Sequence, residues 1–503
     1  MTRRTQGAAR DAGAAPRARW SAREITILAL ITLAGAALRA WLMTQNSGLT
    51  MDSPLYVRMA EQIRSGQKAI GFAHHGYPAL MALIGGLAPS LETAGRLLSW
   101  LAGVALIPLA YALARTAASA AWSAFAAVLV ALQPTVAVYS GPVMTETTIL
   151  ALTTAALLLL ARGKPLGAGV GLGLAYAVRP DALVILPAAA CLTRRGVRGA
   201  LRLLAGFAIV AAPYVGYLSW ERGTFTYTPK SVLVRADGGE REWQVGAEAR
   251  PAPAPPVADR VRDVAARYPA KFVQHGYRLL QAWPWPLMLL SMLGLVARFG
   301  PPAAVLIAFF GLPLLGISPD VRFSQVFVPA LACFAALGGA WLAARGSRVA
   351  RAAWAAAIAC AAGGLILAWL GRAGVNALRF DDGPMREMRD AGEWLKAHGR
   401  PGATVMDRKA YVAYYAGMHH LQLPADDYDT VIDYARRNAD YLVLEEYIVE
   451  TLRPEFKPLT RDPEFQARER RLRMVYGVRH GPLTGVGVLE VVKDTSAAHG
   501  SAP

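Results

Sequence analysis

The chain has 503 residues, of which 54% are hydrophobic and 17% charged, and its mean hydropathy is +0.30. This composition is too apolar for an ordinary soluble enzyme of that length. The net charge of +18 would suggest nucleic-acid binding in a soluble protein, but much of the lysine and arginine lies in short loops between apolar segments. We therefore predict a polytopic α-helical membrane protein that does not bind nucleic acid.

An Arg- and Ala-rich stretch, residues 1–23, is predicted to be a disordered basic cytoplasmic tail. The apolar run after it is long enough to span a membrane and has no small-residue cleavage site behind it, so we expect an uncleaved first span. The predicted number of spans is about eleven, several of them shorter than the usual ~20 residues. They lie at residues 24–43, 95–114, 121–139, 147–161, 166–178, 182–193, 203–220, 284–297, 302–316, 324–344 and 353–370.

Basic residues in alternate loops predict how these spans are oriented. If the N-terminus is cytoplasmic, every cytoplasmic loop is basic, as the positive-inside rule requires. The same parity places the loops 44–94 and 221–281 and the C-terminal region on the extracytoplasmic face. Residues 76–88, at ~13 residues, are too short to span and are predicted to form a re-entrant or interfacial helix. The basic residues of the cytoplasmic loops are Arg115, Arg162, Lys164, Arg194, Arg195, Arg198, Arg298, Arg345, Arg348 and Arg351.

A short amphipathic helix is predicted just after the first span. Ser53 suits its N-cap and Pro54 its first position, which leaves Asp52 beside a helix N-terminus that favours an ionised carboxylate. Asp52 is the first candidate for a base that accepts a proton from an acceptor hydroxyl. The alternative is that Asp52 only helps to cap an interfacial helix. Tyr56 and Arg58 share this helix and either bind substrate or face water.

Two further motifs lie at the outer ends of spans. Glu146 begins one span, where a carboxylate is costly unless it is paired or hydrated, so it is a candidate to orient an acceptor or hold a cation. A glutamate stabilised by the helix dipole is the alternative. Arg179 and Asp181 flank Pro180. The planar fork of Arg179 suits a lipid phosphate, whereas a salt bridge to Asp181 that closes a turn is the alternative.

Asp320 and Arg322 stand before the span 324–344 and form a similar acidic and basic pair. Arg322 is a second candidate for binding phosphate, with interfacial snorkelling as its alternative. His74 and His75 lie in the first outer loop and are candidates to bind phosphate or assist proton transfer. Adjacent histidines are more often loop residues than metal ligands.

Lys271 and His275 precede the span 284–297 and are candidates to contact a substrate headgroup. A basic interfacial helix followed by a tryptophan belt explains them as well. The stretch 235–256 is rich in Gly, Pro, Ala and charge, and is predicted to be a flexible lid on the acceptor side.

Residues 371–503 have the composition of a soluble domain, predicted to be a small extracytoplasmic α/β domain with a disordered end. The apolar periodicity changes between helical and strand patterns along this region. Helices are predicted over 386–398 and 428–438, and strands over 403–406, 441–445, 474–478 and 487–492.

The three cysteines, Cys191, Cys333 and Cys360, lie within apolar runs and have no metal-ligand spacing. We therefore predict neither a disulfide framework nor a metal site. Glycine-rich runs occur within or beside apolar helices, where glycine serves close packing rather than nucleotide binding. No cofactor is expected, and the substrate is expected to come from the membrane.

The order of these motifs resembles the GT-C superfamily of polyprenyl-phosphate-sugar glycosyltransferases, in particular the bacterial relatives of protein O-mannosyltransferases and of the lipid A aminoarabinose transferase. One departure concerns the first outer loop, where many relatives have two adjacent acidic residues and this chain has Asp52 followed by Ser53. This departure puts a metal site in the loop in doubt. The resemblance covers roughly residues 20–345, and its matching residues are Asp52, Tyr56, Ala60, Gly66, Tyr77, Pro78, Met144, Glu146, Arg179, Pro180 and Arg322.

The resemblance implies a GT-C-like catalytic domain over residues 24–370 in the bacterial cytoplasmic (inner) membrane. Asp52 would be the general base, helped by Glu146, while the sugar carbon is attacked opposite the leaving polyprenyl phosphate and is inverted. Arg179 and Arg322 would stabilise the leaving phosphate. The implied partners are a polyprenyl-phosphate sugar donor carrying a hexose or pentose, membrane lipids, and a glycan, lipid or protein acceptor.

Two other classes of protein remain as alternatives. A transporter or flippase of lipid-linked glycans would place its polar residues at the bilayer midplane and show repeat symmetry. The ionisable candidates here gather at one membrane surface instead. A non-catalytic assembly or receptor protein would use its C-terminal domain to bind partners.

Overall fold

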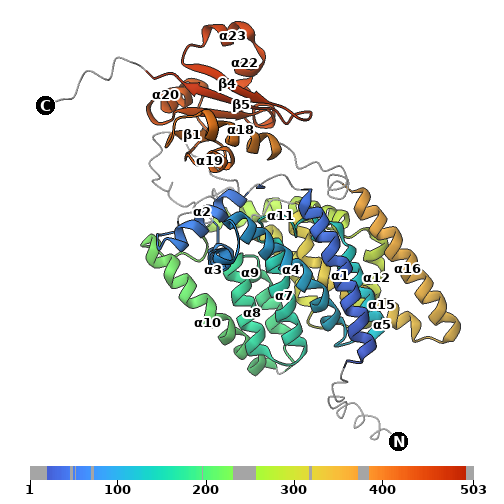
Figure 1. Ribbon diagram of the computed structural model, residues 1–503. Coiled ribbons are helices and arrows are strands. Elements are labelled where there is room, and N and C mark those ends of the chain that lie inside the picture. The colour runs from blue at the N-terminus through green and yellow to red at the C-terminus, as the bar shows by residue number, and fades with distance from the viewer. Residues whose placement is uncertain are drawn as a thin grey trace, which may run out of the picture.

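The computed structural model has two parts, a bundle of helices and a C-terminal domain with a β-sheet that lies over one end of the bundle (Figure 1). This arrangement confirms the predicted helical membrane fold with a small C-terminal α/β domain. The predicted lid at 235–256 lies outside the described residues. The structure describes residues 20–45, 49–50, 52–69, 73–194, 196–229, 257–315, 320–371 and 385–493.

The helix α1 (Ala22–Thr44) begins the bundle and runs toward the end that the C-terminal domain covers (Figure 1). Its start is a capping box, because the Ser21 hydroxyl accepts from the Glu24 N–H at 3.2 Å and the Glu24 carboxylate accepts from the Ser21 N–H at 2.8 Å. At the covered end, α2 (Ser53–Arg64) packs against α3 (Gly76–Ile84), which a 3-10 turn continues to Leu87.

The remaining helices of the bundle follow in chain order and have these bounds: α4 Leu91–Ala114, α5 Ala120–Leu132, α6 Pro134–Val138, α7 Glu146–Ala161, α8 Pro165–Val178, α9 Ala182–Cys191, α10 Gly196–Arg222, α11 Val257–Ala282, α12 Trp285–Ala297, α13 Ala303–Ala308, η3 Phe309–Leu315, α14 Val321–Ser324, η4 Gln325–Phe327, α15 Val328–Ala343 and α16 Ser347–Leu370.

Within the described residues, five helical segments are long and apolar enough to cross a membrane: Ala22–Thr44, Leu91–Ala114, Gly196–Glu221, Val321–Ala343 and Ser347–Leu370. A sixth is reached if α11 and α12, bent by 104° at a short break, count as one span. Several other apolar helices, α3 among them, are shorter. The predicted total of about eleven spans therefore stays a prediction.

Three predicted spans are not single continuous α-helices. The segment 121–139 ends its first helix at Leu132, because Pro134 begins a new one, α6. The segment 302–316 is α13 followed by the 3-10 helix η3, which contains Pro313. The helix α15 is preceded by α14 and the 3-10 turn η4.

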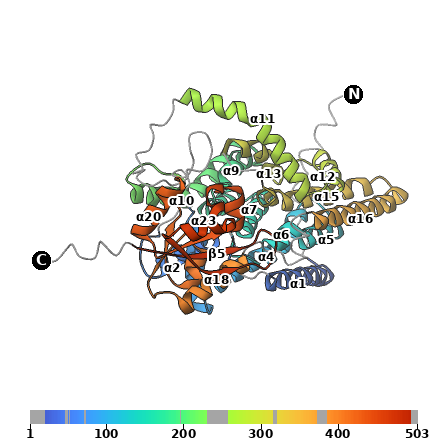
Figure 2. The same ribbon diagram turned by 90° about the horizontal axis from the view of Figure 1, so that it is seen from above.

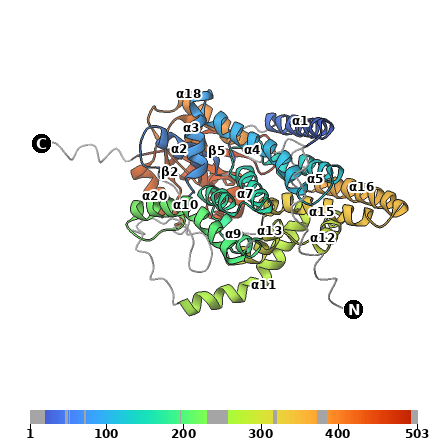
Figure 3. The ribbon, with the colours of Figure 1, turned by 90° about the horizontal axis from the view of Figure 1, so that it is seen from below.

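Figures 2 and 3 place α11 along the periphery of the bundle.

Close helix packing in the bundle depends on glycine. A Cβ atom at Gly169 of α8 would lie 2.0 Å from the carbonyl oxygen of Leu203 on α10. A Cβ atom at Gly294 of α12 would lie 1.8 Å from the carbonyl oxygen of Phe334 on α15. At both places the two backbones approach more closely than any residue with a side chain allows, as is common in membrane bundles.

The break after α5 is stabilised by a buried arginine that the sequence analysis did not single out. Arg39 of α1 is fully buried, and its guanidinium donates to the carbonyl oxygens of Ala131 at 2.9 Å and Val130 at 3.0 Å, and to Gly35 within α1 at 3.0 Å. These two carbonyl groups are among the last of α5 and lack helical partners. Arg39 therefore satisfies a helix end inside the bundle.

The C-terminal domain contains a five-stranded mixed sheet in the order β2-β1-β3-β5-β4. The strand β1 (Thr404–Asp407) runs parallel to β2 (His419–Gln422) and β3 (Tyr441–Glu445), and β5 (Val486–Val491) pairs antiparallel with β3 and β4 (Leu472–Val478). The predicted helices and strands of this region are all present within two residues of their predicted bounds. The elements not predicted are β2, the helices α19 Tyr411–Ala416, α21 Glu446–Thr451, α22 Lys457–Arg461 and α23 Pro463–Arg468, and the 3-10 helix η5 Pro454–Phe456.

The main helices of this domain are α18 (Met385–His398) and α20 (Tyr428–Asn438). The Asp427 carboxylate caps α20 by accepting from the Thr430 N–H at 3.1 Å. Seen from above, the domain covers the bundle around α2 and α7 and leaves α12 and α16 uncovered (Figure 2). Asp52 stands at the start of α2 and Glu146 at the start of α7.

Candidate active site

A polar pocket at the covered end of the bundle brings together predicted residues from five separate segments. They come from the start of α2, the residues just before α3, the start of α7, the junction of α8 and α9, and α14. The cavity volume is about 20 Å³, which is room for about one water molecule. A sugar phosphate therefore requires this pocket to widen. It is lined by Asp52, Tyr56, Ala73, His74, Thr145, Glu146, Val178, Arg179, Pro180, Arg322 and Phe323.

Asp52 occupies the N-cap position of α2, but its side chain makes no capping hydrogen bond. The predicted N-cap role of Ser53 is wrong, because Ser53 is the first helical residue and its hydroxyl donates to the Val143 carbonyl oxygen at 2.9 Å. Asp52 therefore occupies the predicted place of Ser53 at the helix N-terminus, but not through a hydrogen bond from its carboxylate. Its carboxylate instead pairs with Lys409 Nζ at 3.5 Å and with an Arg322 nitrogen at 3.9 Å.

Glu146, Arg179 and Asp181 form a buried ion cluster. One terminal nitrogen of Arg179 lies 3.2 Å from the Glu146 carboxylate, and the other lies 2.7 Å from the Asp181 carboxylate. The Glu146 side chain is only 2% exposed and that of Arg179 is 9% exposed. The salt bridge from Arg179 to Asp181, which was the alternative expected for Arg179, is thus present. Arg179 also pairs with Glu146 on α7 and lines the pocket.

Arg322 and Phe323 of α14 also line the pocket. The Phe323 ring lies 4.5 Å from the guanidinium carbon of Arg322 and 5.0 Å from that of Arg179, so both cations contact one aromatic ring. Asp320 caps α14 by accepting from the Arg322 N–H at 2.8 Å and does not line the pocket. Asp320 therefore positions the backbone of Arg322.

The adjacent histidines His74 and His75 lie in different surroundings. His74 lines the pocket, and its Nε2 lies 3.0 Å from the Thr228 hydroxyl. His75 is turned away, with Nδ1 3.2 Å from the Tyr214 hydroxyl and Nε2 3.3 Å from the Ala69 carbonyl oxygen. His75 therefore belongs to the packing between α3 and α10.

The other predicted substrate contacts differ in their positions. Tyr56 lines the pocket and stacks edge to face on Tyr77 with 5.3 Å between ring centroids. Arg58 is exposed on α2 and does not line it. Lys271 and His275 lie on the peripheral helix α11, which contacts α14 and η3, and neither lines the pocket. Their roles as substrate contacts stay predictions.

Lys409, which reaches Asp52 from the C-terminal domain, was not predicted from the sequence. It lies in an ordinary-looking loop after β1, and 357 residues separate it from Asp52. No local pattern marks it, because its role depends on how the domain lies over the bundle.

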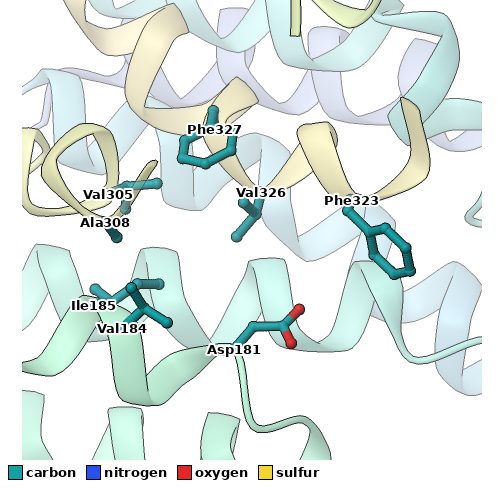
Figure 4. Close-up of a pocket in the computed structure, with 8 residues that line it drawn as sticks. All are labelled: Asp181, Val184, Ile185, Val305, Ala308, Phe323, Val326 and Phe327. Carbon is teal, nitrogen blue, oxygen red and sulfur yellow. The ribbon is translucent and has the colours of Figure 1, made fainter. Parts of the chain in front are cut away.

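A second, apolar pocket adjoins the polar one. Val184 and Ile185 of α9 face Val305 and Ala308 of α13, and Phe323 lines both pockets (Figure 4). Asp181, whose carboxylate pairs with Arg179, stands at the edge of this apolar pocket. An ion cluster and an apolar lining thus meet at the same place, which suits a ligand with a charged head and an apolar tail.

In the described part of the chain, no group of three or more His, Cys, Asp and Glu side chains has an arrangement that could hold a metal ion.

Comparison with known proteins gives structural matches only. No family model and no curated protein sequence matches the chain. The chain is similar to ArnT from Cupriavidus metallidurans, in a crystal structure bound to undecaprenyl phosphate, with a TM-score of 0.58 and 13% identity over 94% of this chain and 99% of that one.

The chain is also similar to the oligosaccharyltransferase of Archaeoglobus fulgidus. The apo structure matches with a TM-score of 0.55 and 12% identity, over 94% of this chain and 75% of that one. The structure of the same enzyme, AglB, with an inhibitory peptide and a dolichol-phosphate matches with a TM-score of 0.51. On these likenesses, the chain has the fold of the GT-C superfamily of glycosyltransferases.

Proposed function

We propose that this protein is a membrane glycosyltransferase that moves a sugar from a polyprenyl-phosphate donor to a cell-envelope acceptor on the extracytoplasmic face, with inversion at the sugar carbon. One observation carries the proposal: the Asp52 carboxylate shares a pocket with Arg179 and Arg322, and an apolar pocket begins at the same wall. A base, two phosphate-binding cations and a lipid-binding surface are the components that this reaction needs.

The proposed reaction is a single displacement. The acceptor hydroxyl gives its proton to Asp52 as its oxygen bonds to the anomeric carbon. The bond from that carbon to the phosphate oxygen breaks, and its electron pair stays on the leaving phosphate. Arg322 and Arg179 stabilise this developing charge, which is electrostatic catalysis of the leaving group. Glu146 acts by orienting Arg179, to which it is paired at 3.2 Å.

Both arginines already have carboxylate partners, so a phosphate binds by replacing or joining them. We assign the first contact with the donor phosphate to Arg322, whose ion pair with Asp52 spans 3.9 Å, whereas Arg179 lies 2.7 Å from Asp181. Movement of Arg322 toward phosphate would widen the pocket and release one side of Asp52.

The donor's lipid would enter at the apolar pocket, which has a cavity volume of about 10 Å³ and would have to widen as well. Its lining between α9 and α13 is aliphatic and aromatic, and it meets the polar pocket at Phe323. A polyprenyl chain bound there would hold its phosphate beside Arg322. The undecaprenyl phosphate bound in the similar ArnT structure supports this class of donor.

The orientation in the membrane is part of the same proposal. The positive-inside pattern supports a cytoplasmic N-terminus and an extracytoplasmic site in the bacterial inner membrane. The C-terminal domain, on the same side as the pocket, would then meet the acceptor, which is a glycan, lipid or protein of the envelope.

The test replaces Asp52 with asparagine in the full-length protein, in a host that lacks the wild-type gene. We expect Asp52→Asn to abolish the modified envelope glycan and to raise the amount of polyprenyl-phosphate sugar in lipid extracts, both measured by mass spectrometry. Glu61→Gln is the matched control, because Glu61 is an exposed carboxylate on the same helix.

Two outcomes would contradict the proposal. Wild-type glycans in the Asp52→Asn strain would remove the assignment of the base. Purified protein that moves a labelled polyprenyl-linked glycan across liposomes without consuming it would instead indicate a flippase.

A further inference from the structure

The C-terminal domain reaches the pocket through the loop between β1 and α19. Lys409 in this loop places its ammonium nitrogen 3.5 Å from Oδ1 of Asp52, while Arg322 lies 3.9 Å from Oδ2. Both oxygens of the carboxylate are thus paired with cations, one from the bundle and one from the C-terminal domain. The side chains of Asp52 and Lys409 are 24% and 32% exposed, so the pair lies at the mouth of the pocket.

The loop that carries Lys409 is fixed on the sheet. Asp407, the last residue of β1, is buried and pairs with His420 of β2 at 2.8 Å. The Gln422 amide donates to the carbonyl oxygen of Arg408 at 2.8 Å, and the Tyr411 N–H donates to that of Lys409 at 2.7 Å. A flexible side chain is therefore mounted on a backbone that the sheet holds in place.

A second contact joins the helix α19, which follows this loop, to the segment before Asp52. The Leu49 N–H donates to the hydroxyl of Tyr415, on α19, at 2.8 Å, and Leu49 is 1% exposed. The Thr50 N–H then donates to the Ser53 hydroxyl at 3.1 Å. The loop before α19 thus contacts the Asp52 carboxylate, and α19 itself contacts the backbone that leads to Asp52.

We propose that Lys409 is a positioning residue for Asp52, through which the C-terminal domain becomes part of the active site. Lys409 holds the carboxylate ionised and aimed into the pocket until the acceptor hydroxyl arrives. It donates no proton in the reaction, because the acceptor proton goes to Asp52. This role rests on the proposed function, in which Asp52 is the base.

Other charged and titratable groups surround the pair of Asp52 and Lys409, and a pH-dependent test has to account for them. Arg322 on α14, Tyr56 on α2 and Tyr411 on α19 all interact electrostatically with Asp52. Glu445, at the end of β3, has a pKa raised to about 7 by burial and by the nearby Asp407, while the positive charges of Arg408 and Lys409 act in the opposite direction. Replacing Glu445 with glutamine removes this second titration from the measured range.

The experiment compares Lys409→Met with Lys409→Arg, both in full-length Glu445→Gln protein in membranes of the deletion host. The probe is isotope-labelled polyprenyl-phosphate sugar extracted from the host's own membranes, and its transfer to endogenous acceptor is followed from acid to neutral pH. We expect Lys409→Met to lower the maximal rate by roughly 10- to 100-fold, because the Asp52 carboxylate would no longer be held in the geometry needed to accept the proton of the acceptor hydroxyl. The KM for the donor should not change.

The pH profile separates positioning from simple loss of structure. In Lys409→Met the acidic limb of the profile should move to higher pH, since a carboxylate without its cationic neighbour takes up a proton more readily. Lys409→Arg keeps the charge and should keep the acidic limb in place with most of the rate. Lys396→Met, an exposed lysine on α18, is the matched control and should behave as the Glu445→Gln parent.

Several results would overturn the role of Lys409. These are a parental rate and pH profile in Lys409→Met, or equal losses in the methionine and arginine variants with no movement of the acidic limb. If the methionine variant is absent from the membrane, Lys409→Gln replaces it with the same expectations. A parent that transfers no sugar would contradict the proposed function itself, and the positioning role with it.

Discussion

At the residue scale, the pocket contains cations that are already paired with carboxylates. Arg179 is held by Glu146 and Asp181, and Arg322 by the more distant Asp52. A buried arginine without such partners would carry a large desolvation cost, so the carboxylates keep both side chains charged and oriented. The arginines are therefore ready to meet a phosphate with little loss of rotamer entropy.

Replacing Arg322 with glutamine tests its assigned contact with the donor phosphate. We expect the rate of sugar transfer to fall by roughly 10²- to 10³-fold, because a donor to the developing charge is lost. Binding of undecaprenyl phosphate to the purified protein, followed by native mass spectrometry, should weaken as well. Arg198→Gln, an exposed arginine at the start of α10, should leave both unchanged. Undiminished lipid binding in Arg322→Gln would mean that another group holds the phosphate.

At the element scale, the site is built where helices begin or are interrupted. The helix α7 begins at Glu146, Asp181 precedes α9, and the four-residue helix α14 carries Arg322. Helix ends leave backbone groups without intrahelical partners, so polar side chains and charges are tolerated there inside an otherwise apolar bundle. The break between α5 and α6 lies away from the pocket, and there Arg39 supplies the polar partner that the carbonyl groups at the helix end need.

Arg39 provides a test of that requirement. Arg39→Leu would leave the carbonyl groups of Val130 and Ala131 unpaired in the bundle. We expect a loss of stability of about 1–3 kcal/mol for each group left unsatisfied, seen as a lower Tm of the detergent-solubilised protein by intrinsic fluorescence. Arg39→Lys, which retains a donor, should lose less. An unchanged Tm in Arg39→Leu would show that these carbonyl groups find other partners.

At the scale of the whole molecule, the C-terminal domain covers the pocket end of the bundle and leaves the other end open (Figure 1). Its position follows from specific contacts, the hydrogen bond from Leu49 to Tyr415 and the ion pair of Lys409 with Asp52. An acceptor must therefore approach beside the domain or displace it.

Cysteine labelling tests the proposed orientation in a background of Cys191→Ala, Cys333→Ala and Cys360→Ala. A membrane-impermeant maleimide added to spheroplasts should label Lys396→Cys, which is in the C-terminal domain. It should label Arg194→Cys, at the opposite end of the bundle, only after permeabilisation. The reverse pattern would invert the topology and place the pocket in the cytoplasm.

The sequence by itself determined the helical membrane fold and the C-terminal α/β domain, and it predicted Asp52, Glu146, Arg179 and Arg322 as site residues, which the structure places around one pocket. Each of these residues is a charge at the end of an apolar segment, and local periodicity and hydropathy are enough to find such positions. Shorter or irregular elements were missed. The break at Pro134 had a local signal in the proline itself, whereas the strand β2 is defined by its pairing with β1.

Only the tertiary structure decided which charges meet. Nothing in the local sequence distinguishes His74, which lines the pocket, from His75, which packs against α10, or Asp181, which pairs with Arg179, from Asp320, which caps a helix. Lys409 belongs to the same class, because an ion pair across 357 residues depends on how two domains pack. Charge at a helix end is a local property of the chain, whereas the partner of that charge is set by long-range packing.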